Sequence, residues 1–423
     1  MTHVFEVLPS GTPSEVGGAG QIVWPVSPGT AGSITTTLQW GLAEFSAASG
    51  STRDLFRIVA ALYLADSLVE KPAVSLHRDL EVHVHVADSA RWTEDVLNAL
   101  VDLARWLTGD RWTVVIHQSA HASDATQVTS LGLDRIQLLS GGLDSLAGAV
   151  IGMKDGAAVG FVGARDYSTA VRHAQNLIAG ALGADATYRL EELLLADASD
   201  RKNHGPRMRS LLFMVMAVLH AENDGAPEVW VPENGFTSIN APLDAGRGGT
   251  LTTRSTHPYT FALVNALLDS LSIEVAVVNP FSALTKGELV GQAKTELRSK
   301  RWAPVTAASY SCGRGNTQRF HADPNLNCGL CVACVVRRGS FIAAGMRDPS
   351  TYACDALSGG HRKDLVEARS RDIYSIREAL AGGIPDVAIL ASGRWPGGTD
   401  FDAVIDLVHR GLEELRAVRL PRP

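Results

Sequence analysis

A six-residue segment places the strongest constraint on the fold of this chain. Ser140–Ser145 (SGGLDS) follows an apolar run at 136–139 and precedes a helical pattern that opens near Asp144. Glycine lacks a Cβ atom, so a ligand can approach the backbone of such a turn closely. A strand, this turn and a helix present backbone N–H groups and the positive end of a helix dipole to an anion. The segment predicts a phosphate-binding loop, and the alternative is a plain turn in which Asp144 caps the helix.

Strands and helices alternate on the C-terminal side of this loop. Further strand-like runs lie at 157–164, 228–233 and 273–281, and helical patterns separate them, including the apolar stretch 209–223. Strands that alternate with helices of about 10–15 residues are typical of a parallel sheet with helices on both faces. We therefore expect an α/β fold with a doubly wound parallel sheet.

The segment in front of this sheet predicts a mixed α/β domain of its own. Residues 80–87 alternate apolar and polar side chains and residues 111–118 are rich in β-branched ones, so both indicate strands, with a helical pattern at 91–107 between them. The polar stretch 121–129 is typical of a linker. His83 and His85 share one strand face, as two metal ligands would, but no cysteine or carboxylate stands directly beside them. We expect that face to be solvated.

The last part of the chain, from about residue 361, is largely helical in pattern. Six apolar residues recur at helical spacing there and predict one docked stripe: Phe401, Val404, Ile405, Val408, Leu412 and Leu415. The stripe would pack on this protein or on a partner.

Charge and apolar runs exclude several classes of protein. The chain has 38 basic and 45 acidic residues, a formal charge of −7, which argues against a general nucleic-acid binder or a protein of anionic membrane surfaces. The longest apolar run, 211–219, is about half as long as a membrane span. The first residues contain no basic segment followed by an apolar one. We expect a cytoplasmic protein.

Four of the five cysteines form a compact pattern near residue 330. Cys312, Cys328, Cys331 and Cys334 have the spacing C-x15-C-x2-C-x2-C, whereas the first 311 residues contain no cysteine. Four thiolates at such spacing can close a tetrahedral Zn²⁺ site, and four of them suggest a structural rather than a catalytic metal. An iron–sulfur cluster or a redox-active C-x-x-C pair is the alternative. Cys354 is left over.

The loop also resembles a known signature. SGGLDS matches the SGGxDS motif of the PP-loop ATP pyrophosphatases and lacks the lysine that a Walker loop would carry after its last glycine. The resemblance implies cleavage of ATP between the α and β phosphates, with adenylation of a carboxylate or carbonyl oxygen. The loop would then hold the pyrophosphate, and Asp144 would orient Mg²⁺.

Taken with the cysteines, residues of about 132–352 resemble the 7-cyano-7-deazaguanine synthase (QueC) family. The segments that carry the resemblance are SGGLDS, GPRMRSLLF, PFSALTKGELV, SYSCGRGN and NCGLCVACVVRRGSFIAAGMRDPSTY. By this resemblance Arg209, and secondarily Arg207, lie near the nucleotide phosphates, and Lys286 contacts a phosphate or the adenylate. The family's activity implies adenylation of 7-carboxy-7-deazaguanine by ATP. An amine then attacks; in the synthase it is ammonia, and a second ATP dehydrates the amide to the nitrile.

The chain departs from this family in three places. One is the strand tail that resembles FDYGQ in the family and is GARDYSTA here. The family's substrate segment is replaced by VPENGFTSINAPLDAGRGG and TTRSTHP, so the pocket candidates here are Glu233, Asn234, Thr237, Arg254 and His257. About 130 residues in front and about 70 behind are additional. The additions resemble QueC-like proteins of bacterial anti-phage operons, of the QatC type, for which the acceptor amine is thought to be the N-terminus of a partner protein.

The leading hypothesis is therefore an AMP-forming ligase that activates 7-carboxy-7-deazaguanine, or a close analogue, and transfers it to an amine of a co-encoded protein. The alternatives are a synthase that uses ammonia, a PP-loop tRNA thiolase and a non-catalytic nucleotide-binding adapter. The expected domains are an N-terminal α/β domain (1–131), a PP-loop ATP-binding domain (132–300), a zinc-binding module (301–355) and a helical extension (356–423).

The expected cofactors are ATP, Mg²⁺ and Zn²⁺. The predicted catalytic residues are Ser140, Asp144, Ser145, Lys286 and Arg209. The predicted nucleotide-binding residues are Ser140, Gly141, Gly142, Leu143, Asp144, Ser145, Arg209, Glu233 and Asn234. The predicted metal ligands are Cys312, Cys328, Cys331 and Cys334.

Overall fold

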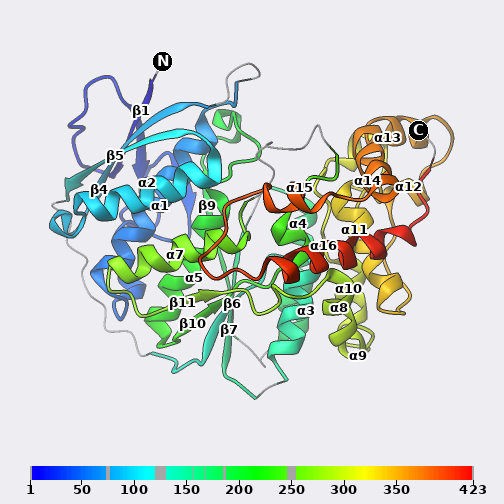
Figure 1. Ribbon diagram of the computed structural model, residues 1–423. Helices are drawn as coiled ribbons and strands as arrows, with labels where there is room; N and C mark the ends of the chain where they lie inside the picture. Colours follow the sequence, from blue (N-terminus) through cyan, green and yellow to red (C-terminus); the bar gives the residue numbers. More distant parts are fainter. Residues whose placement is uncertain are drawn as a thin grey trace.

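The computed structural model describes residues 2–72, 77–119, 130–154, 156–165, 167–183, 187–244 and 254–421. An N-terminal and a central parallel sheet occupy one part of the molecule. The helices of the C-terminal third lie beside the central sheet (Figure 1). The linker predicted at 121–129 lies outside the described residues.

The central sheet has five strands: β6 (Arg135–Leu138), β7 (Val159–Ala164), β8 (Thr187–Glu191), β10 (Glu228–Trp230) and β11 (Ala276–Val278). They are hydrogen-bonded in the order β11-β10-β6-β7-β8, and every pairing is parallel. The strands β6, β7 and β8 therefore form one half of the sheet. The later strands β10 and β11 form the other half, on the opposite side of β6. This order confirms the doubly wound parallel sheet, and it places a topological switch point between β6 and β10, where such folds bind ligands.

Helices cover both faces of the central sheet. On one face α5 (Arg209–Asp224) contacts β6, β7 and β10, and α7 (Pro258–Ser270) contacts β11. On the other face the apolar residues of α3 (Leu143–Gly152) and α4 (Thr169–Leu182) share a core with alternate residues of β7. Only alternate residues of β7 face this core, because successive side chains of a strand point to opposite faces of the sheet.

The N-terminal sheet is also parallel. Its strands are β1 (Thr2–Pro9), β2 (Gly20–Trp24), β4 (Asp79–Val86) and β5 (Arg111–Gln118), in the order β2-β1-β4-β5. Both strands predicted from the sequence are confirmed, and the helix predicted at 91–107 is present as α2 (Glu94–Thr108).

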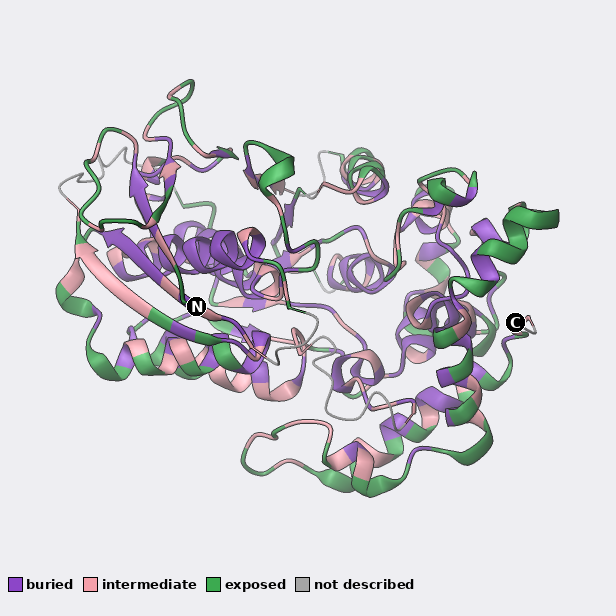
Figure 2. Ribbon diagram, turned by 90° about the horizontal axis from the view of Figure 1, so that it is seen from above, coloured by how far each residue is buried: buried purple, intermediate pink, exposed green. Residues whose placement is uncertain are grey.

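One apolar core joins the two sheets. Helix α1 (Gly50–Leu68) packs against both β4 and α5, and nearly all of its side chains are buried. The core extends from the N-terminal sheet through α1 and α5 to β6 and β10, and the helices between the sheets are accordingly coloured as buried in Figure 2. A short antiparallel pair, β3 (Ile34–Thr36) with β9 (Leu193–Leu195), adds a second link. The domain boundaries stay predictions.

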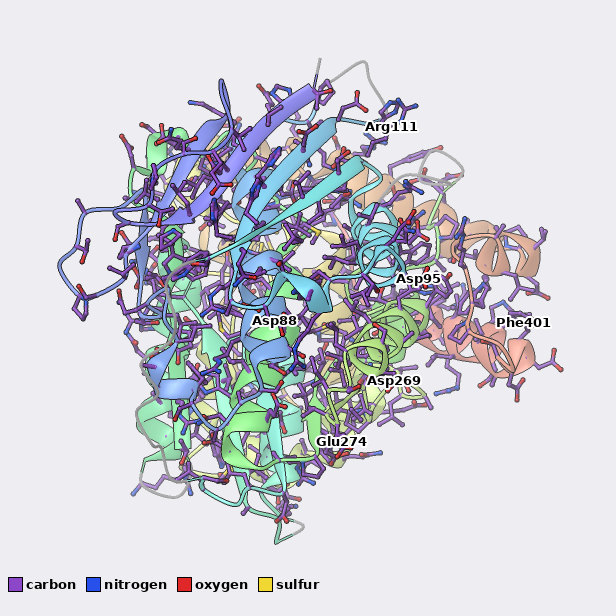
Figure 3. The ribbon with its side chains drawn as sticks, turned by 90° about the vertical axis from the view of Figure 1, so that its left-hand side faces the viewer. Asp88, Asp95, Arg111, Asp269, Glu274 and Phe401 are labelled. Atoms are coloured by element: carbon purple, nitrogen blue, oxygen red, sulfur yellow. The ribbon has the colours of Figure 1, made fainter. Side chains whose placement is uncertain are left out.

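The predicted helical C-terminal region is confirmed. It contains α13 (Gly359–Glu367), α14 (Ser370–Gly382), α15 (Asp386–Leu390) and α16 (Phe401–Arg416), and α16 packs on α11 (Val332–Ala343). Its apolar stripe therefore docks on this protein, whereas Phe401, at the beginning of α16, stays 44% exposed (Figure 3). No helix among the described residues is long and apolar enough to cross a membrane.

A buried carboxylate of α1 fixes the start of α5. Asp66 is fully buried, and it accepts hydrogen bonds from the Asn203 side chain at 2.8 Å and from the Met208 backbone N–H at 3.0 Å. It also pairs with the guanidinium of Arg78 at 2.5 Å. Because Met208 directly precedes the first residue of α5, Arg209, the N-terminal region holds the backbone beside a predicted nucleotide contact.

Replacing Asp66 with alanine is expected to lower the free energy of unfolding by about 2–4 kcal/mol. The buried donors of Asn203 and Met208 lose this acceptor, whereas Arg78 keeps a second carboxylate, Asp110, at 2.6 Å. Urea unfolding measures this change. The matched control is Asp102→Ala on α2. Its carboxylate is 66% exposed and pairs with the exposed Arg105, so the variant should cost less than about 1 kcal/mol. Equal costs for the two variants would contradict the role given to Asp66.

Candidate functional site

The glycine loop lies at the C-terminal end of β6, at the switch point of the sheet. Gly141 has φ +95°, a conformation that favours glycine, and Gly142 is the N-cap of α3. The hydroxyls of Ser140 and Ser145 lie 3.2 Å apart, and the Gly142 N–H lies 3.4 Å from the Ser140 hydroxyl. The loop therefore gathers hydroxyl and backbone donors at the N-terminus of a ten-residue helix, as an anion site requires.

Loops that follow three different strands converge on Asp144. The Asn234 amide, after β10, donates to Asp144 Oδ2 at 2.8 Å, and the Lys286 ammonium, after β11, donates to the same oxygen at 3.0 Å. The side chains of Asp144 and Lys286 are each only 7% exposed. The other oxygen, Asp144 Oδ1, is buried and has no hydrogen-bond partner among the described residues. An orphaned carboxylate oxygen beside a phosphate-type loop fits a hard cation such as Mg²⁺.

Glu233 supplies a second carboxylate to the same group. Its Oε1 accepts from the Thr237 hydroxyl at 2.7 Å and from the Asn234 amide at 3.3 Å, so Asn234 bridges the two acidic side chains. Burial and the adjacent charge of Asp144 raise the pKa of Glu233 well above its ordinary value. Burial opposes the charge of Asp144 too, but Lys286 and the hydrogen bonds from Glu233 and Asn234 lower its pKa. The proton is therefore held more readily by Glu233 than by Asp144.

These groups line a cavity of about 1070 Å³. The predicted residues that line it are Ser140, Gly142, Leu143, Asp144, Ser145, Arg209, Glu233 and Lys286. The volume is ample for a nucleotide together with a second small molecule.

Some predicted residues lie elsewhere. Asn234 is fully buried and orients Asp144 without lining the cavity. Gly141 does not line the cavity either. His257 was expected in the pocket. It is instead the N-cap of α7 and lies buried against Trp106 and Trp395. Arg254 stacks on Trp106 and lines a neighbouring cavity together with Thr237, which borders both.

The sequence did not identify two contributions to the site. Tyr310, Ser311 and Asn316, which flank Cys312, line the cavity, and the Ser311 hydroxyl lies 3.4 Å from the Leu143 N–H of the loop. Their only signal was their place within SYSCGRGN.

The second missed contribution comes from α16. Glu414 accepts from the Gly287 backbone N–H at 2.9 Å and from the Thr285 hydroxyl. Gly287 and Thr285 flank Lys286, the first residue of α8 (Lys286–Gln292), so the C-terminal extension fixes the backbone that carries the lysine.

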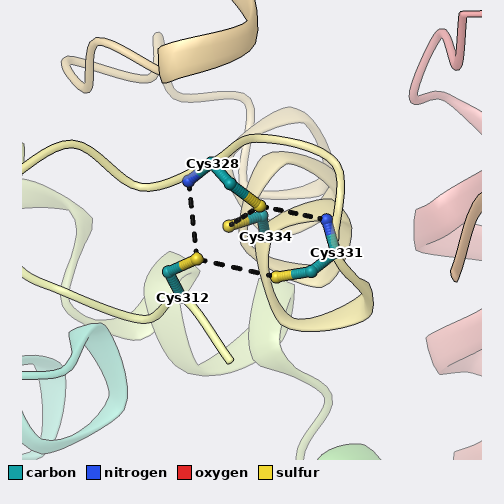
Figure 4. Close-up of side chains that lie close together, drawn as sticks. All are labelled: Cys312, Cys328, Cys331 and Cys334. Carbon is teal, nitrogen blue, oxygen red and sulfur yellow. Dashed lines mark hydrogen bonds between the residues drawn. The ribbon is translucent and has the colours of Figure 1, made fainter. Parts of the chain in front are cut away.

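The four predicted cysteines converge on one point (Figure 4). Their sulfur atoms all lie within 4.8 Å of one another, with Cys312 Sγ 3.9 Å from Cys331 Sγ and Cys328 Sγ 3.8 Å from Cys334 Sγ. A tetrahedral Zn²⁺ with four bonds of about 2.3 Å would hold its sulfurs about 3.8 Å apart. The residues therefore fit zinc as a closed structural site, without His321 or Cys354.

A second cavity of about 810 Å³ adjoins the first. The two share His204, Arg209, Thr237, Ser255 and Ala333 as lining residues. Four arginines line the second cavity, Arg207, Arg209, Arg254 and Arg314, and Asp372 is the one carboxylate among its described lining residues. Leu107 from the N-terminal region and Asp372 from α14 both contribute, so the extensions help to build it.

Comparisons with known proteins agree with this site. No family model matches the chain. The 7-cyano-7-deazaguanine synthase of Erythrobacter litoralis is 29% identical in an alignment of 241 positions that covers 52% of this chain and 92% of that protein. The protein of the same name from Rhizorhabdus wittichii is 28% identical over 52% of this chain and 96% of its own length. That of Methanococcus maripaludis is 37% identical, over 79 residues that make up 31% of its length. Over about half of its length the chain is therefore similar to proteins named 7-cyano-7-deazaguanine synthase.

Proposed function

We propose that this protein is an ATP-dependent, AMP-forming ligase that activates the carboxylate of 7-carboxy-7-deazaguanine or a close analogue. The observation that carries the proposal is the convergence of Asp144, Asn234 and Lys286 beside the glycine loop, at the switch point of a doubly wound sheet. The similarity to proteins named 7-cyano-7-deazaguanine synthase supports the substrate class.

Each group then has a role. The loop N–H groups and the hydroxyls of Ser140 and Ser145 hold the pyrophosphate, and the cations Lys286 and Arg209 face the same cavity and balance its charge. Asp144 Oδ1 would hold Mg²⁺, and Glu233 would be a second ligand once the cation displaces its proton. When bound, Mg²⁺ neutralises the phosphate charge that develops as the bond between the α and β phosphates breaks.

We further propose that the acceptor is the amine of a co-encoded protein. In this step the amine nitrogen attacks the acyl carbon, AMP leaves with the oxygen that joined it to the acyl group, and the amine loses one proton. The adjoining 810 Å³ cavity supports a large acceptor, since ammonia needs no such chamber. Its four arginines favour an acceptor segment that carries acidic residues. By this proposal the protein acts in anti-phage defence.

The second candidate is a synthase that uses ammonia, which the names of the relatives favour. One experiment separates the two. Purified protein is incubated with ATP, Mg²⁺ and 7-carboxy-7-deazaguanine, with and without ammonium, and products are quantified by mass spectrometry. Substrate-dependent AMP without nitrile supports the ligase with a protein acceptor. Nitrile formation with ammonium supports the synthase. Absence of AMP under all conditions would overturn the substrate assignment.

Glu233→Gln gives a sharp test of the second carboxylate. Glutamine copies the neutral form of Glu233, so the fold should persist while AMP formation falls about 100-fold, because the cation loses a ligand. A raised pKa means that folded Glu233 keeps its proton above its ordinary value of 4.5, so wild-type stability falls as pH rises from there. In Mg²⁺-free buffer, Glu233→Gln removes this pH-dependent loss of stability. The melting temperature of the variant minus that of wild type should therefore increase as pH rises. A constant difference would contradict the raised pKa.

A further inference from the structure

A hollow of about 450 Å³ lies between the turn that follows Cys312 and the start of α14. It shares Arg314 with the 810 Å³ cavity, and it shares the two residues after Arg314 with the 1070 Å³ cavity, so it adjoins both. Three arginines and no acidic residue are among the described residues that line it: Arg314, Gly315, Asn316, Arg319, Ala368 and Arg369. The hollow therefore attracts anions.

Arg369 is the buried cation of this hollow. It is only 7% exposed, and its guanidinium donates to the backbone carbonyls of Arg314 at 2.8 Å and of Ala368 at 3.2 Å. Its Nε is buried and has no hydrogen-bond partner in the described ranges, and within the same ranges no carboxylate pairs with it. Burial of an unpaired charge costs free energy, and an anion in the hollow would offset that cost.

Arg337 shows how this fold satisfies a buried arginine that does not line a cavity. It is fully buried, and no carboxylate of the described chain pairs with it either. It lines none of the three cavities. Its guanidinium donates to four oxygen atoms, which belong to Ser309, Ser311, Ser350 and the carbonyl of Thr306. Arg369 donates to two oxygen atoms and borders open space, which favours a ligand as its further acceptor.

Two exposed arginines add donors to the same hollow. Arg319 forms no hydrogen bond or ion pair with any described residue. Its guanidinium carbon lies 5.0 Å from the centre of the Phe320 ring, and that of Arg369 lies 5.6 Å from the same centre. The ring attracts both cations but carries no charge to neutralise them. Arg314 pairs through Nε with Asp372 at 3.4 Å, so three guanidinium groups and one carboxylate leave a charge of about +2.

We propose that this hollow is a binding site for one phosphate group, separate from the glycine loop. A phosphate group carries close to two negative charges near neutral pH, which matches the charge around the hollow. Guanidinium groups bind the oxygens of phosphate through pairs of parallel N–H donors. Arg369 is also the N-cap of α14, so the positive end of that helix dipole has the same sign. Free phosphate and the phosphate of a nucleotide share this chemistry.

The test uses full-length protein whose cysteine centre is loaded with zinc. The glycine loop is first saturated with α,β-methylene-ATP, which resists cleavage between the α and β phosphates. Isothermal titration with inorganic phosphate at constant ionic strength should then show one equivalent bound. A parallel titration with AMP distinguishes the two sources, because tighter binding of AMP than of inorganic phosphate identifies a nucleotide as the ligand.

Arg319→Gln should lower the affinity for phosphate at least about tenfold, because charge-assisted hydrogen bonds are lost, and the one printed contact it removes is the stacking on Phe320. Arg369→Lys keeps the charge but lacks the planar pair of donors, and it should lower the affinity to a similar extent. Arg111→Gln is the matched control. It removes the same charge from β5, where Arg111 is 67% exposed, and it should bind phosphate as wild type does.

Thermal melting confirms that each variant is folded, and phosphate should raise the melting temperature of wild type more than that of Arg319→Gln. The inference is overturned if wild type binds no phosphate beside the ATP analogue, or if Arg319→Gln and Arg369→Lys both bind as wild type does. Equal weakening by Arg111→Gln would also overturn it, since binding would then be a general effect of surface charge.

This inference does not rest on the proposed function, because no turnover is measured. If α,β-methylene-ATP itself does not bind, the proposed function fails. The comparison of Arg319→Gln with Arg111→Gln still decides whether the hollow binds phosphate.

Discussion

Asp144→Asn is expected to lower the rate of AMP formation by about 100–1000-fold, the range seen when one preorganised electrostatic contact is removed from an active site. Asp144 lies where the loops after β6, β10 and β11 meet, and its Oδ1 faces no protein partner among the described residues. Asparagine keeps the shape of the side chain but removes the negative charge that Lys286 and a metal ion both require. The measurement is substrate-dependent AMP release at saturating ATP and Mg²⁺.

The control for this variant is Asp406→Asn on α16, a carboxylate that is 64% exposed and far along the chain from the loop. It should leave the rate within twofold of wild type. If Asp144→Asn also stays within twofold, Asp144 has no part in the chemistry. If neither wild type nor variant releases AMP, while both bind nucleotide, the protein is an adapter and the proposed ligase is wrong.

Cys328→Ser should abolish zinc binding and destabilise the whole C-terminal half. Cys328 is fully buried in a core with Phe320, Leu330 and Tyr352, and this core has few large apolar side chains of its own. Structural zinc contributes about 10–16 kcal/mol in small zinc-dependent folds, which is comparable to the whole stability of a typical domain. We expect the variant to contain less than a tenth of the zinc of wild type and to melt far below it. Metal analysis and thermal melting measure these effects.

Cys354→Ala is the matched control, since Cys354 is buried in the same core but lies outside the group of four sulfurs. It should keep one equivalent of zinc and cost about 1 kcal/mol, as ordinary for the loss of one small buried group. Zinc loss in Cys354→Ala, or full zinc content in Cys328→Ser, would contradict the assignment of the ligands.

The sequence predicted those features that local pattern determines. The glycine loop after β6 and the cysteine spacing each lie within a short stretch of chain, and both reappear in the structure as expected. The convergence of Asn234 and Lys286 on Asp144 is also a consequence of topology, because the C-terminal ends of adjacent parallel strands meet at one edge.

Long-range pairings escaped prediction for a physical reason. His85 meets Glu6 from 79 residues away and His83 meets His117 from 34 residues away, so no local pattern marks either pair, and the expectation of a solvated face was wrong. The same holds for Asp66, which bonds Met208 across 142 residues, and for Glu414, which bonds Gly287 across 127. Each is an ordinary acidic residue of a helix until the tertiary fold supplies its partner.

The position of Glu414 also orders events during synthesis. A chain leaves the ribosome from its N-terminus, so Asp66 is available before the helix that carries Arg209 exists, whereas Glu414 emerges 127 residues after the Gly287 backbone that it binds. A nascent chain can therefore complete its sheet and its glycine loop while the lysine-bearing turn still lacks its support. A chain that stops before residue 414 would therefore carry the glycine loop while the turn around Lys286 lacks the contacts that Glu414 supplies.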